Sequence, residues 1–321
     1  MAAAAILYHY PCPDGAFAAL AAHLYFKATC LPSLFFPNTV YRPLTPHDLP
    51  LTQISHLYLL DFVGPPHFLQ DISAKVQSVI VLDHHKTALE RLGSENLGAK
   101  NVDKVIDMER SGATIALDYF KEKLMNHDAV KHQSVLDEFE RVRQLFRYIE
   151  DGDLWRWKLH NSKAFSSGLK DLNIEFDVRK NPSMFDQLLS LDLDCVISQG
   201  MKSLSHKQKL MDDCISKSYE IALGNGAFGC CLAVDADTTL SELRSELGHQ
   251  LAIKSQKMKL RGIGAIVYKV AELENDHKFK ISLRSVENED TTPISQEFGG
   301  GGHRNASSFM LSCEEFEQWK V

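Results

Sequence analysis

Short apolar runs alternate with helical patterns along the first half of the chain. Residues 5–9, 56–61 and 79–83 are mostly apolar runs that read as buried strands. Residues 16–26 carry large apolar side chains at helical spacing, and residues 111–123 read as a second helix. Strands that alternate with helices are typical of βαβ units, so the pattern predicts a mostly parallel sheet.

The second half begins with helical patterns and then returns to strands. Residues 135–149 form a long amphipathic pattern, and residues 184–222 are expected to be further helix that connects two domains. Strand patterns then surround a helix expected at residues 240–252; they cover residues 228–234, 264–270 and 279–283.

Length and composition fit a two-domain globular protein. The chain has 321 residues, of which 44% are hydrophobic and 24% charged, and about 150 residues per domain is usual. We therefore expect an α/β fold with three parts. These are a parallel-sheet N-terminal domain (residues 1–183), a helical linker (184–224) and a smaller α/β C-terminal domain (225–321).

Charge and cysteine usage exclude several classes of protein. The net charge of −7 does not suit non-specific binding of long duplex nucleic acid, although a local basic pocket for a short phosphate ligand stays open. The seven cysteines form no C-x-x-C pair, so we expect neither a disulfide scaffold nor a zinc ribbon. Without a signal-peptide pattern or a membrane-length apolar run, the sequence predicts a cytoplasmic protein with no membrane partner.

Polar side chains of metal-binding types follow each of the three strands predicted in the first domain. In open parallel sheets, ligands bind at the carboxyl ends of the strands, so these residues are expected to converge. Carboxylates and imidazoles together suit a divalent ion such as Mn²⁺. The alternative is that aspartates end strands merely as turn or cap residues. The candidates are His9, Asp14, Asp61, Asp83, His84 and His85.

These motifs resemble the DHH phosphoesterase superfamily. The similarity is carried by Asp83-His84-His85, by Asp61, by the Cys12–Gly15 loop and by the late glycine run, and it covers nearly the whole chain. It implies an N-terminal DHH domain and a C-terminal DHHA1 domain, with the active site in the cleft between them. Members hydrolyse phosphodiester or phosphoanhydride bonds with two Mn²⁺ ions. They include RecJ-type exonucleases, oligoribonucleases, nucleotide phosphatases, cyclic-dinucleotide phosphodiesterases and family II pyrophosphatases.

The resemblance also implies a role for each motif residue. It assigns metal binding to His9, Asp14, Asp61 and His84, with Asp61 bridging two divalent ions; Mn²⁺ is expected, with Mg²⁺ or Co²⁺ as alternatives. Asp83 is expected to orient His84, and His85 to face the substrate phosphate. One further aspartate ligand is expected after a helix. Asp151 is the first choice and Asp153 the alternate.

Cys12 departs from the family pattern. The first motif usually carries two aspartates separated by one residue, and Cys12 occupies the first of these places. A thiolate is a soft ligand that matches Mn²⁺ poorly. Either the first ion is held more weakly with water, or Cys12 indicates a different metal preference. A small packed side chain is the remaining alternative.

The late glycine run resembles the substrate loop of DHHA1 domains. Consecutive glycines let backbone N–H groups approach a phosphate, and His303 and Arg304 add donors and charge. A flexible glycine linker is the alternative. Arg284 ends a predicted strand and either pairs with a phosphate or is simply solvated. The expected substrate-binding residues are His85, Arg284, Gly300, Gly301, Gly302, His303 and Arg304.

Two further segments carry weaker signals. Ser111-Gly112 precedes a helix, and Ser111 either caps it or marks an anion site at the helix start. Trp155 and Trp157 either stack a nucleobase or belong to the core.

The combined pattern predicts a manganese-dependent phosphodiesterase that hydrolyses short single-stranded oligonucleotides or small nucleotides by water attack. One alternative is a phosphatase or pyrophosphatase acting on small phosphate esters or anhydrides. Another is a nucleotide-binding protein that has lost turnover, because its first motif is incomplete. A homodimer is compatible with the sequence.

Overall fold

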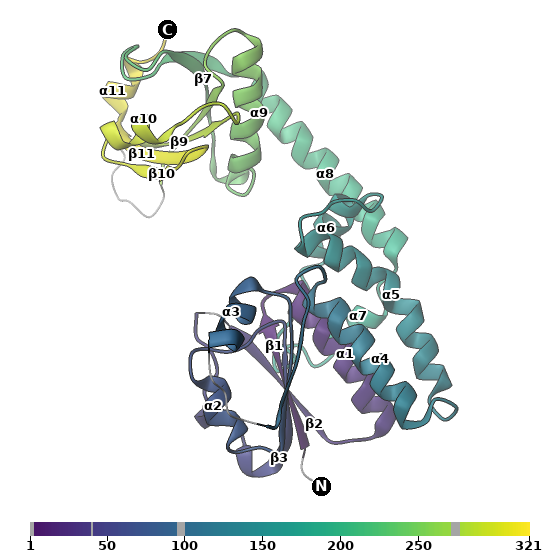
Figure 1. The fold of residues 1–321 in the computed structure, drawn as a ribbon. Coiled ribbons are helices and arrows are strands. Elements are labelled where there is room, and N and C mark those ends of the chain that lie inside the picture. Colours follow the sequence, from purple (N-terminus) through teal and green to yellow (C-terminus); the bar gives the residue numbers. More distant parts are fainter. Residues whose placement is uncertain (1–2, 40, 95–99, 271–276) are drawn as a thin grey trace. The chain divides into compact units, whose positions relative to one another are not determined.

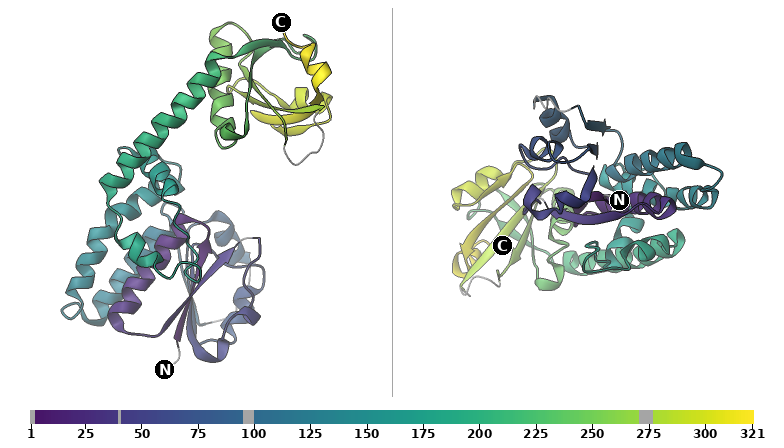
Figure 2. Two further views of the ribbon diagram at one scale, coloured as in Figure 1. Left: turned by 180° about the vertical axis from the view of Figure 1, so that it is seen from behind. Right: turned by 90° about the horizontal axis from the view of Figure 1, so that it is seen from below.

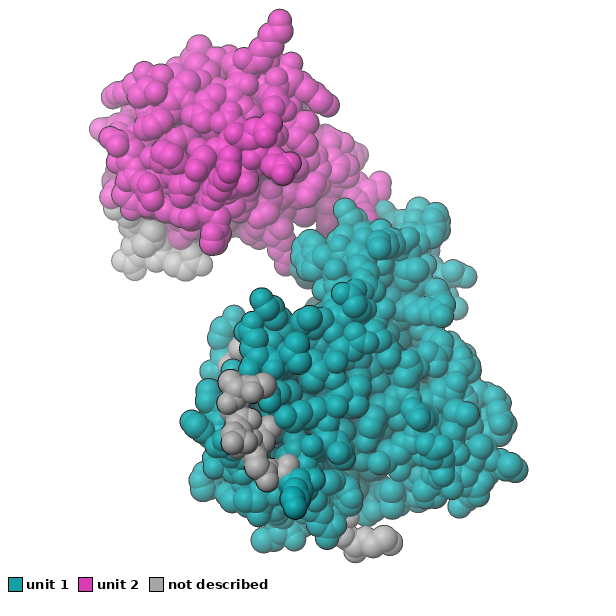
Figure 3. Space-filling model, viewed as in Figure 1, with its two compact units in different colours: residues 1–203 teal, residues 204–321 magenta. Residues whose placement is uncertain are grey.

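Two sheets organise the chain, one in each of two units. The computed structural model describes residues 3–39, 41–94, 100–270 and 277–321. The units comprise residues 1–203 and residues 204–321, which are coloured separately in Figure 3. Helix α8 (Leu193–Ser216) runs across the division, which falls inside the stretch predicted to connect two domains. No helix in the described part of the chain is long and apolar enough to span a membrane.

The first unit contains a five-stranded parallel sheet in the order β2-β1-β3-β4-β5 (Figure 1). Alternate residues of β1 enter two different cores: Ile6 and Tyr8 pack on one side of the sheet, and Ala5 and Leu7 on the other. Burial on both faces explains why the strands read as continuous apolar runs. The strands are β1 (Ala3–Tyr10), β2 (Ser33–Thr39), β3 (Ile54–Leu60), β4 (Ser78–Asp83) and β5 (Val102–Ile106).

Helices cover both faces of this sheet. Helices α1 and α4 pack against one face, with α5 packed on these two helices, while α2 and α3 lie on the other face (Figures 1 and 2). Alanines on α1 are fully buried, because small side chains allow this helix to pass close to α4. The helices are α1 (Pro13–Thr29), α2 (Phe68–Ser73), α3 (Lys86–Ser94), α4 (Gly112–Asp128), α5 (Gln133–Asp153), α6 (Ser162–Asp171) and α7 (Met184–Leu189).

The α/β class and the parallel sheet predicted from the sequence are confirmed. The three predicted strands correspond to β1, β3 and β4, which are the central three. The two edge strands were not predicted. Strand β2 contains Pro37, and β5 exposes Asp103 and Lys104, so neither carries the apolar run of a buried strand.

The second unit is built on a six-stranded mixed sheet in the order β10-β11-β9-β8-β7-β6. Only β7 and β8 pair in parallel; the other neighbours are antiparallel. Helix α9 packs against one face, and Phe316 and Trp319 lie in the core on the other. The elements are β6 (Tyr219–Ala222), β7 (Cys230–Asp235), α9 (Arg244–Lys257), β8 (Ile263–Tyr268), β9 (Lys278–Ser285), α10 (Thr292–Glu297), β10 (Gly301–His303), β11 (Ala306–Ser312) and α11 (Cys313–Glu317).

The predicted helical stretch 184–222 is partly wrong. Helices α7 and α8 fill most of it, but residues 219–222 form strand β6 and pair with β7. Ile221 and Leu223 alternate into the second unit's core, and this burial favours a strand over a continued helix. At the other end, Met184 and Leu188 of α7 belong to the first unit's core, so the stretch is not a free linker there.

Candidate metal centre

The central strands of the first sheet bring three chemically active segments to one edge. Strand β1 leads to α1 and then to β2 on one side, while β3 and β4 follow on the other side, so the strand order reverses between β1 and β3. Crevices at such reversal points, at the carboxyl ends of the strands, are where open α/β sheets bind ligands. His9, Asp61 and Asp83 lie at or just beyond the carboxyl ends of β1, β3 and β4.

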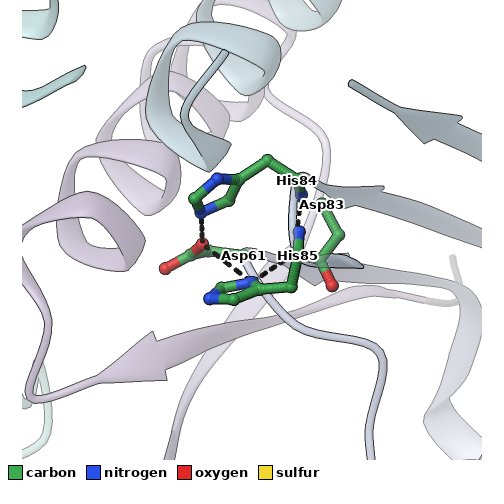
Figure 4. A group of neighbouring side chains, drawn as sticks. All are labelled: Asp61, Asp83, His84 and His85. Atoms are coloured by element: carbon green, nitrogen blue, oxygen red, sulfur yellow. Dashed lines mark hydrogen bonds and ion pairs between the residues drawn. The ribbon is translucent and has the colours of Figure 1, made fainter. Parts of the chain in front are cut away.

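Asp61 occupies the middle of this edge. It follows β3 directly with a backbone φ of 65°, in the left-handed region that non-glycine residues rarely adopt. Its N–H donates to the carbonyl of Leu82 (2.8 Å), and its side chain is only 1% exposed. Oδ2 lies 3.0 Å from Nδ1 of His9, and Oδ1 lies 3.2 Å from Nε2 of His84. Figure 4 shows Asp61 between the side chains of the Asp83–His85 segment.

Two more carboxylates reach His84 from the helices. Asp14 lies in the first turn of α1, and its Oδ2 is 3.8 Å from Nε2 of His84. Asp153 is the last residue of α5, and its Oδ2 is 3.5 Å from the same nitrogen. Four segments that are distant in sequence therefore meet around one imidazole.

The donor atoms of this centre fit divalent cations. Among the described residues, Asp14 Oδ2, Asp61 Oδ1 and His84 Nε2 are buried and make no hydrogen bond of regular geometry, although Asp61 Oδ1 and His84 Nε2 lie close enough to form an ion pair. Burying unpaired polar and charged atoms is costly unless something satisfies them. Their ligand atoms also gather in groups within 4.8 Å: Asp14 with His84 and Asp153, His9 with Cys12 and Asp61, and Asp61 with Asp83, His84 and His85. Carboxylate oxygens and imidazole nitrogens are suitable ligands for such an ion.

The crowding of carboxylates shifts their acidities in different directions. Burial raises the pKa of Asp14, and the charges of Asp61 and Asp153 raise it further. The pKa of Asp153 is also raised, first by burial and then by the charge of Asp61. Burial also favours the neutral form of Asp61, but the imidazoles of His84 and His9 outweigh it and hold the pKa of Asp61 below its ordinary value. A cation at the centre would relieve the repulsion that these shifts express.

The structure corrects the expected role of Asp83. Its Oδ1 accepts from the backbone N–H of His84 (2.7 Å) and lies 2.8 Å from Nδ1 of His85, so it orients the ring of His85 and not that of His84. The hydrogen bond to Asp83 raises the pKa of His85 to about 9 against the opposing effect of burial. His85 keeps 44% of its side chain exposed. A cationic imidazole therefore faces out from the centre.

The choice between Asp151 and Asp153 is also corrected. The carboxylate of Asp151 accepts from the backbone N–H groups of Lys158 (3.0 Å) and Leu159 (3.2 Å), so it ties down the loop after α5. It joins none of the donor groups around His84, whereas Asp153 does. The alternate, Asp153, is thus the residue that the structure brings to the centre.

The start of α4 supports the centre in a way that the sequence reading missed. The N–H of Ala113 donates to Asp14 Oδ1 (3.1 Å), where the positive end of the helix dipole favours a carboxylate. A Cβ on Gly112 would lie 2.7 Å from the Cβ of Asp61 and 2.9 Å from Asp14 Oδ2. Only glycine therefore lets the two carboxylates approach this helix. Ser111 does cap α4, by accepting from the N–H of Thr114; the glycine after it was the available signal.

The predicted substrate loop lies in the second unit and is structured. Gly301–His303 form β10 and pair with β11, so the segment is not a flexible linker. A Cβ on Gly300 would lie 2.1 Å from the carbonyl oxygen of Ser308, so β11 requires a glycine there. His303 is exposed, and Arg304 donates to the carbonyl of Glu289 (3.3 Å).

Arg284 has protein partners of its own. It lies in β9 and donates to the carbonyl of Leu283 (2.9 Å) and to the hydroxyl of Ser245 (3.0 Å).

A cavity of about 960 Å³ borders the metal centre within the first unit. Asp14 and Asp153 contribute to its wall, so it opens directly onto the candidate ligands. Trp155 is 79% exposed, and its ring meets that of Trp157 edge-on at 5.6 Å. Beside apolar and hydroxyl side chains and the carboxylate of Glu175, the wall carries aromatic and basic residues; these include Tyr10, Tyr148, Trp155, Trp157, Lys163 and Lys170.

Comparisons with known proteins give distant similarities. No family model matches the chain. Uncharacterized protein R106 of Acanthamoeba polyphaga mimivirus is 26% identical over 327 residues, which cover 98% of this chain and 69% of that protein. An exopolyphosphatase-related protein from Bacteroides fragilis is a similar solved structure (TM-score 0.41, 14% identity, 96% of this chain and 86% of that one). The pGpG-specific phosphodiesterase PggH from Vibrio cholerae is another (TM-score 0.40, 12% identity, 99% and 96%).

The arrangement of the centre itself agrees with the resemblance to the DHH phosphoesterase superfamily. Residues of the expected motifs, His9, Asp14, Asp61 and His84, meet at one edge of a parallel sheet. Chance placement of turn residues at strand ends does not explain this convergence, because it would leave the buried oxygens without a role.

Proposed function

We propose that the chain is a metal-dependent phosphoesterase that hydrolyses phosphodiester bonds of short oligonucleotides or small nucleotides. The observation that supports this most is the buried, unpartnered set of Asp14 Oδ2, Asp61 Oδ1 and His84 Nε2. With His9 and Asp153, these residues would hold two divalent ions, as the DHH resemblance implies, with Mn²⁺ as the expected metal. Bound ions would activate water and neutralise charge on the phosphoryl group.

The chain's own residues would divide the remaining work. Asp61 presents one oxygen toward His9 and the other toward His84, so its carboxylate would serve both donor groups if ions were bound. His85 is held by Asp83 and stays partly exposed, so it can donate to a phosphate oxygen at the edge of the centre. Removing the Asp83 hydrogen bond would leave this ring free to turn and would lower its charge at neutral pH.

The cavity supports a substrate with a nucleobase. Its aromatic wall offers faces for stacking, and Lys163 and Lys170 provide positive charge beside them. The net charge of −7 argues against long duplex nucleic acid as a partner. We further propose that the loop Gly300, Gly301, Gly302, His303 and Arg304, with Arg284, contacts the substrate from a C-terminal DHHA1 domain, and that the protein acts in the cytoplasm.

Product analysis tests this function. The full chain is incubated with Mn²⁺ and a labelled dinucleotide, and chromatography is expected to detect nucleoside monophosphates. Asp61→Asn should reduce the rate by at least ~100-fold, because it removes the charge shared by two ligand groups. Asp194→Asn is the matched control; it alters an exposed aspartate at the start of α8 and should leave the rate unchanged.

Two other outcomes would replace this proposal. Release of inorganic phosphate from pyrophosphate or a nucleoside bisphosphate, without cleavage of dinucleotides, would indicate a phosphatase or pyrophosphatase. Binding of nucleotides without turnover under any metal would indicate a binding protein.

A further inference from the structure

Cys12 lies in the metal centre. Its Sγ, a ring nitrogen of His9 and a carboxylate oxygen of Asp61 all lie within 4.8 Å of one another. Cys12 is the residue before α1, with an extended backbone (φ −88°, ψ 133°), and its side chain makes no capping hydrogen bond to the helix. The sulfur is therefore placed with two recognised metal-ligand types and does not cap the helix.

The two donor groups that would hold separate ions differ in chemistry. Asp14, His84 and Asp153 supply two oxygens and one nitrogen, a set that suits Mn²⁺. His9, Cys12 and Asp61 supply one nitrogen, one sulfur and one oxygen. Soft thiolates favour Zn²⁺ and related ions and match Mn²⁺ or Mg²⁺ poorly.

The spacing of the sulfur-containing group is compatible with a small cation. A tetrahedral ion with usual Zn–S and Zn–N bonds separates its ligand atoms by roughly 3.4–3.6 Å. The ligand atoms lie within 4.8 Å of one another, so they would have to draw together by roughly 1.4 Å at most, which side-chain rotation can supply. Asp61 is 1% exposed and supplies this position with Oδ2, 3.0 Å from Nδ1 of His9, while its other oxygen, Oδ1, is buried on the side of His84.

We infer that Cys12 ligates the ion at the His9–Cys12–Asp61 position as a thiolate, and that this position selects a thiophilic divalent cation such as Zn²⁺, Fe²⁺ or Co²⁺. The Asp14–His84–Asp153 position takes the harder ion. The centre is thus a mixed one, in which a single sulfur separates the metal preferences of two neighbouring positions. This inference deepens the proposed function and rests on its metal centre.

Cobalt provides a spectroscopic test that does not depend on turnover. Metal-free full-length chain is titrated with Co²⁺, and a thiolate-to-cobalt charge-transfer band is expected in the near ultraviolet. Cys12→Ser should lose this band and keep the visible ligand-field bands of the second position. Cys30→Ser is the matched control, because Cys30 is an exposed thiol in the same unit, and it should retain the band.

Metal affinity gives the second measurement. Zn²⁺ affinity measured by chelator competition should fall at least ~10-fold in Cys12→Ser, since loss even of groups that only support a metal ligand typically costs about 10–100-fold. Cys12→Asp should lose the cobalt charge-transfer band and gain Mn²⁺ affinity. Circular dichroism of each variant establishes that it is folded.

The result that overturns the inference is a cobalt-loaded chain without the charge-transfer band, or a band that survives in Cys12→Ser. The cobalt band tests the sulfur ligand independently of the proposed phosphoesterase activity. A band with no hydrolysis of any phosphoester would support the sulfur ligand and refute the phosphoesterase. Hydrolysis without a band would support the enzyme and refute the sulfur ligand.

Discussion

Truncation of Trp155 tests whether the cavity beside the metal centre binds a nucleobase. The side chain is 79% exposed, so Trp155→Ala removes little packing and should leave the fold intact. Stacking of one base on an aromatic ring contributes about 1–3 kcal/mol, which corresponds to a roughly 5–150-fold weaker interaction when the ring is lost. We expect the KM for a dinucleotide to rise by such a factor while kcat changes little, because the ring lies outside the ligand groups.

The assay uses the three tryptophans of the chain as reporters. Trp319 is buried in the second unit, whereas Trp155 and Trp157 line the cavity, so adenosine monophosphate should quench only part of the fluorescence. Ribose 5-phosphate is the matched ligand without a base and should quench weakly. Trp155→Phe should keep most of the affinity, since it keeps an aromatic face.

The stacking interpretation fails under either of two results. One is a dinucleotide KM within twofold of the unmodified chain in Trp155→Ala. The other is equal quenching by adenosine monophosphate and ribose 5-phosphate, which would mean that the phosphate alone is recognised.

Three further predictions follow from particular contacts. Gly112→Ala should lower turnover and metal affinity by at least ~100-fold with unchanged circular dichroism, because its Cβ would displace the carboxylates beside it; near-normal metal binding would refute this. Asp153→Asn should weaken metal binding measured by calorimetry, whereas Asp151→Asn should spare it and reduce the free energy of unfolding by about 1–3 kcal/mol, since Asp151 holds a loop. The hydrogen bond to Arg261 lowers the pKa of Glu289 below its ordinary 4.5, so this carboxylate stabilises the second unit above that pH and loses its effect as the pH falls through the lower, folded-state value. Glu289→Gln should therefore reduce the free energy of unfolding by about 1 kcal/mol at pH 7 and by less as the pH falls below 4.5, as measured by urea titration; an equal loss at every pH would refute the ion pair.

The sequence was sufficient to predict the buried strands and the sheet edge at which they end. Strands β1, β3 and β4 are buried on both faces, and such burial leaves a continuous apolar run that can be read directly. The polar residues that follow them converge because the strands are parallel and adjacent, which the alternation of strands and helices already implied. Edge strands β2 and β5 lack this signal, since only central strands are covered on both sides.

The error at Asp151 came from the phase of a helix. Residues two positions apart on a helix are separated by about 200° around its axis, so Asp151 and Asp153 point in nearly opposite directions. The apolar stripe of α5 passes through Phe146 and Ile149, which are buried against α1, and it reaches Asp153 at the next step of four. The apolar face of the helix therefore points to Asp153, but only if the helix continues beyond residue 149. The helix expected from the sequence ended at that residue. Helix ends are the least readable part of such patterns.

The features that the sequence could not provide are backbone geometries at the turns. Asp61 has a left-handed backbone, which has no signature in its residue type, and the glycine at position 112 does not by itself reveal that it leaves the space that this carboxylate and Asp14 occupy. Both depend on where α4 begins relative to the end of β3, which is a tertiary relation. Such strained or close-packed positions persist only when the surrounding structure holds them and when they serve the site.

The electrostatics of the centre connect folding with function. Asp14 and Asp61 are each 1% exposed, and the ion pairs that the described residues make with them are to imidazoles, not to lysine or arginine. A histidine carries a full charge only when protonated, and the two buried carboxylates Asp14 and Asp61 share the single imidazole of His84. The remaining compensation here is one helix N-terminus at Asp14. A protein that only needed a stable sheet edge would gain by replacing these carboxylates with apolar side chains. Their presence in a buried site, next to donors spaced for a cation, is explained if the ion supplies both the missing charge balance and the chemistry.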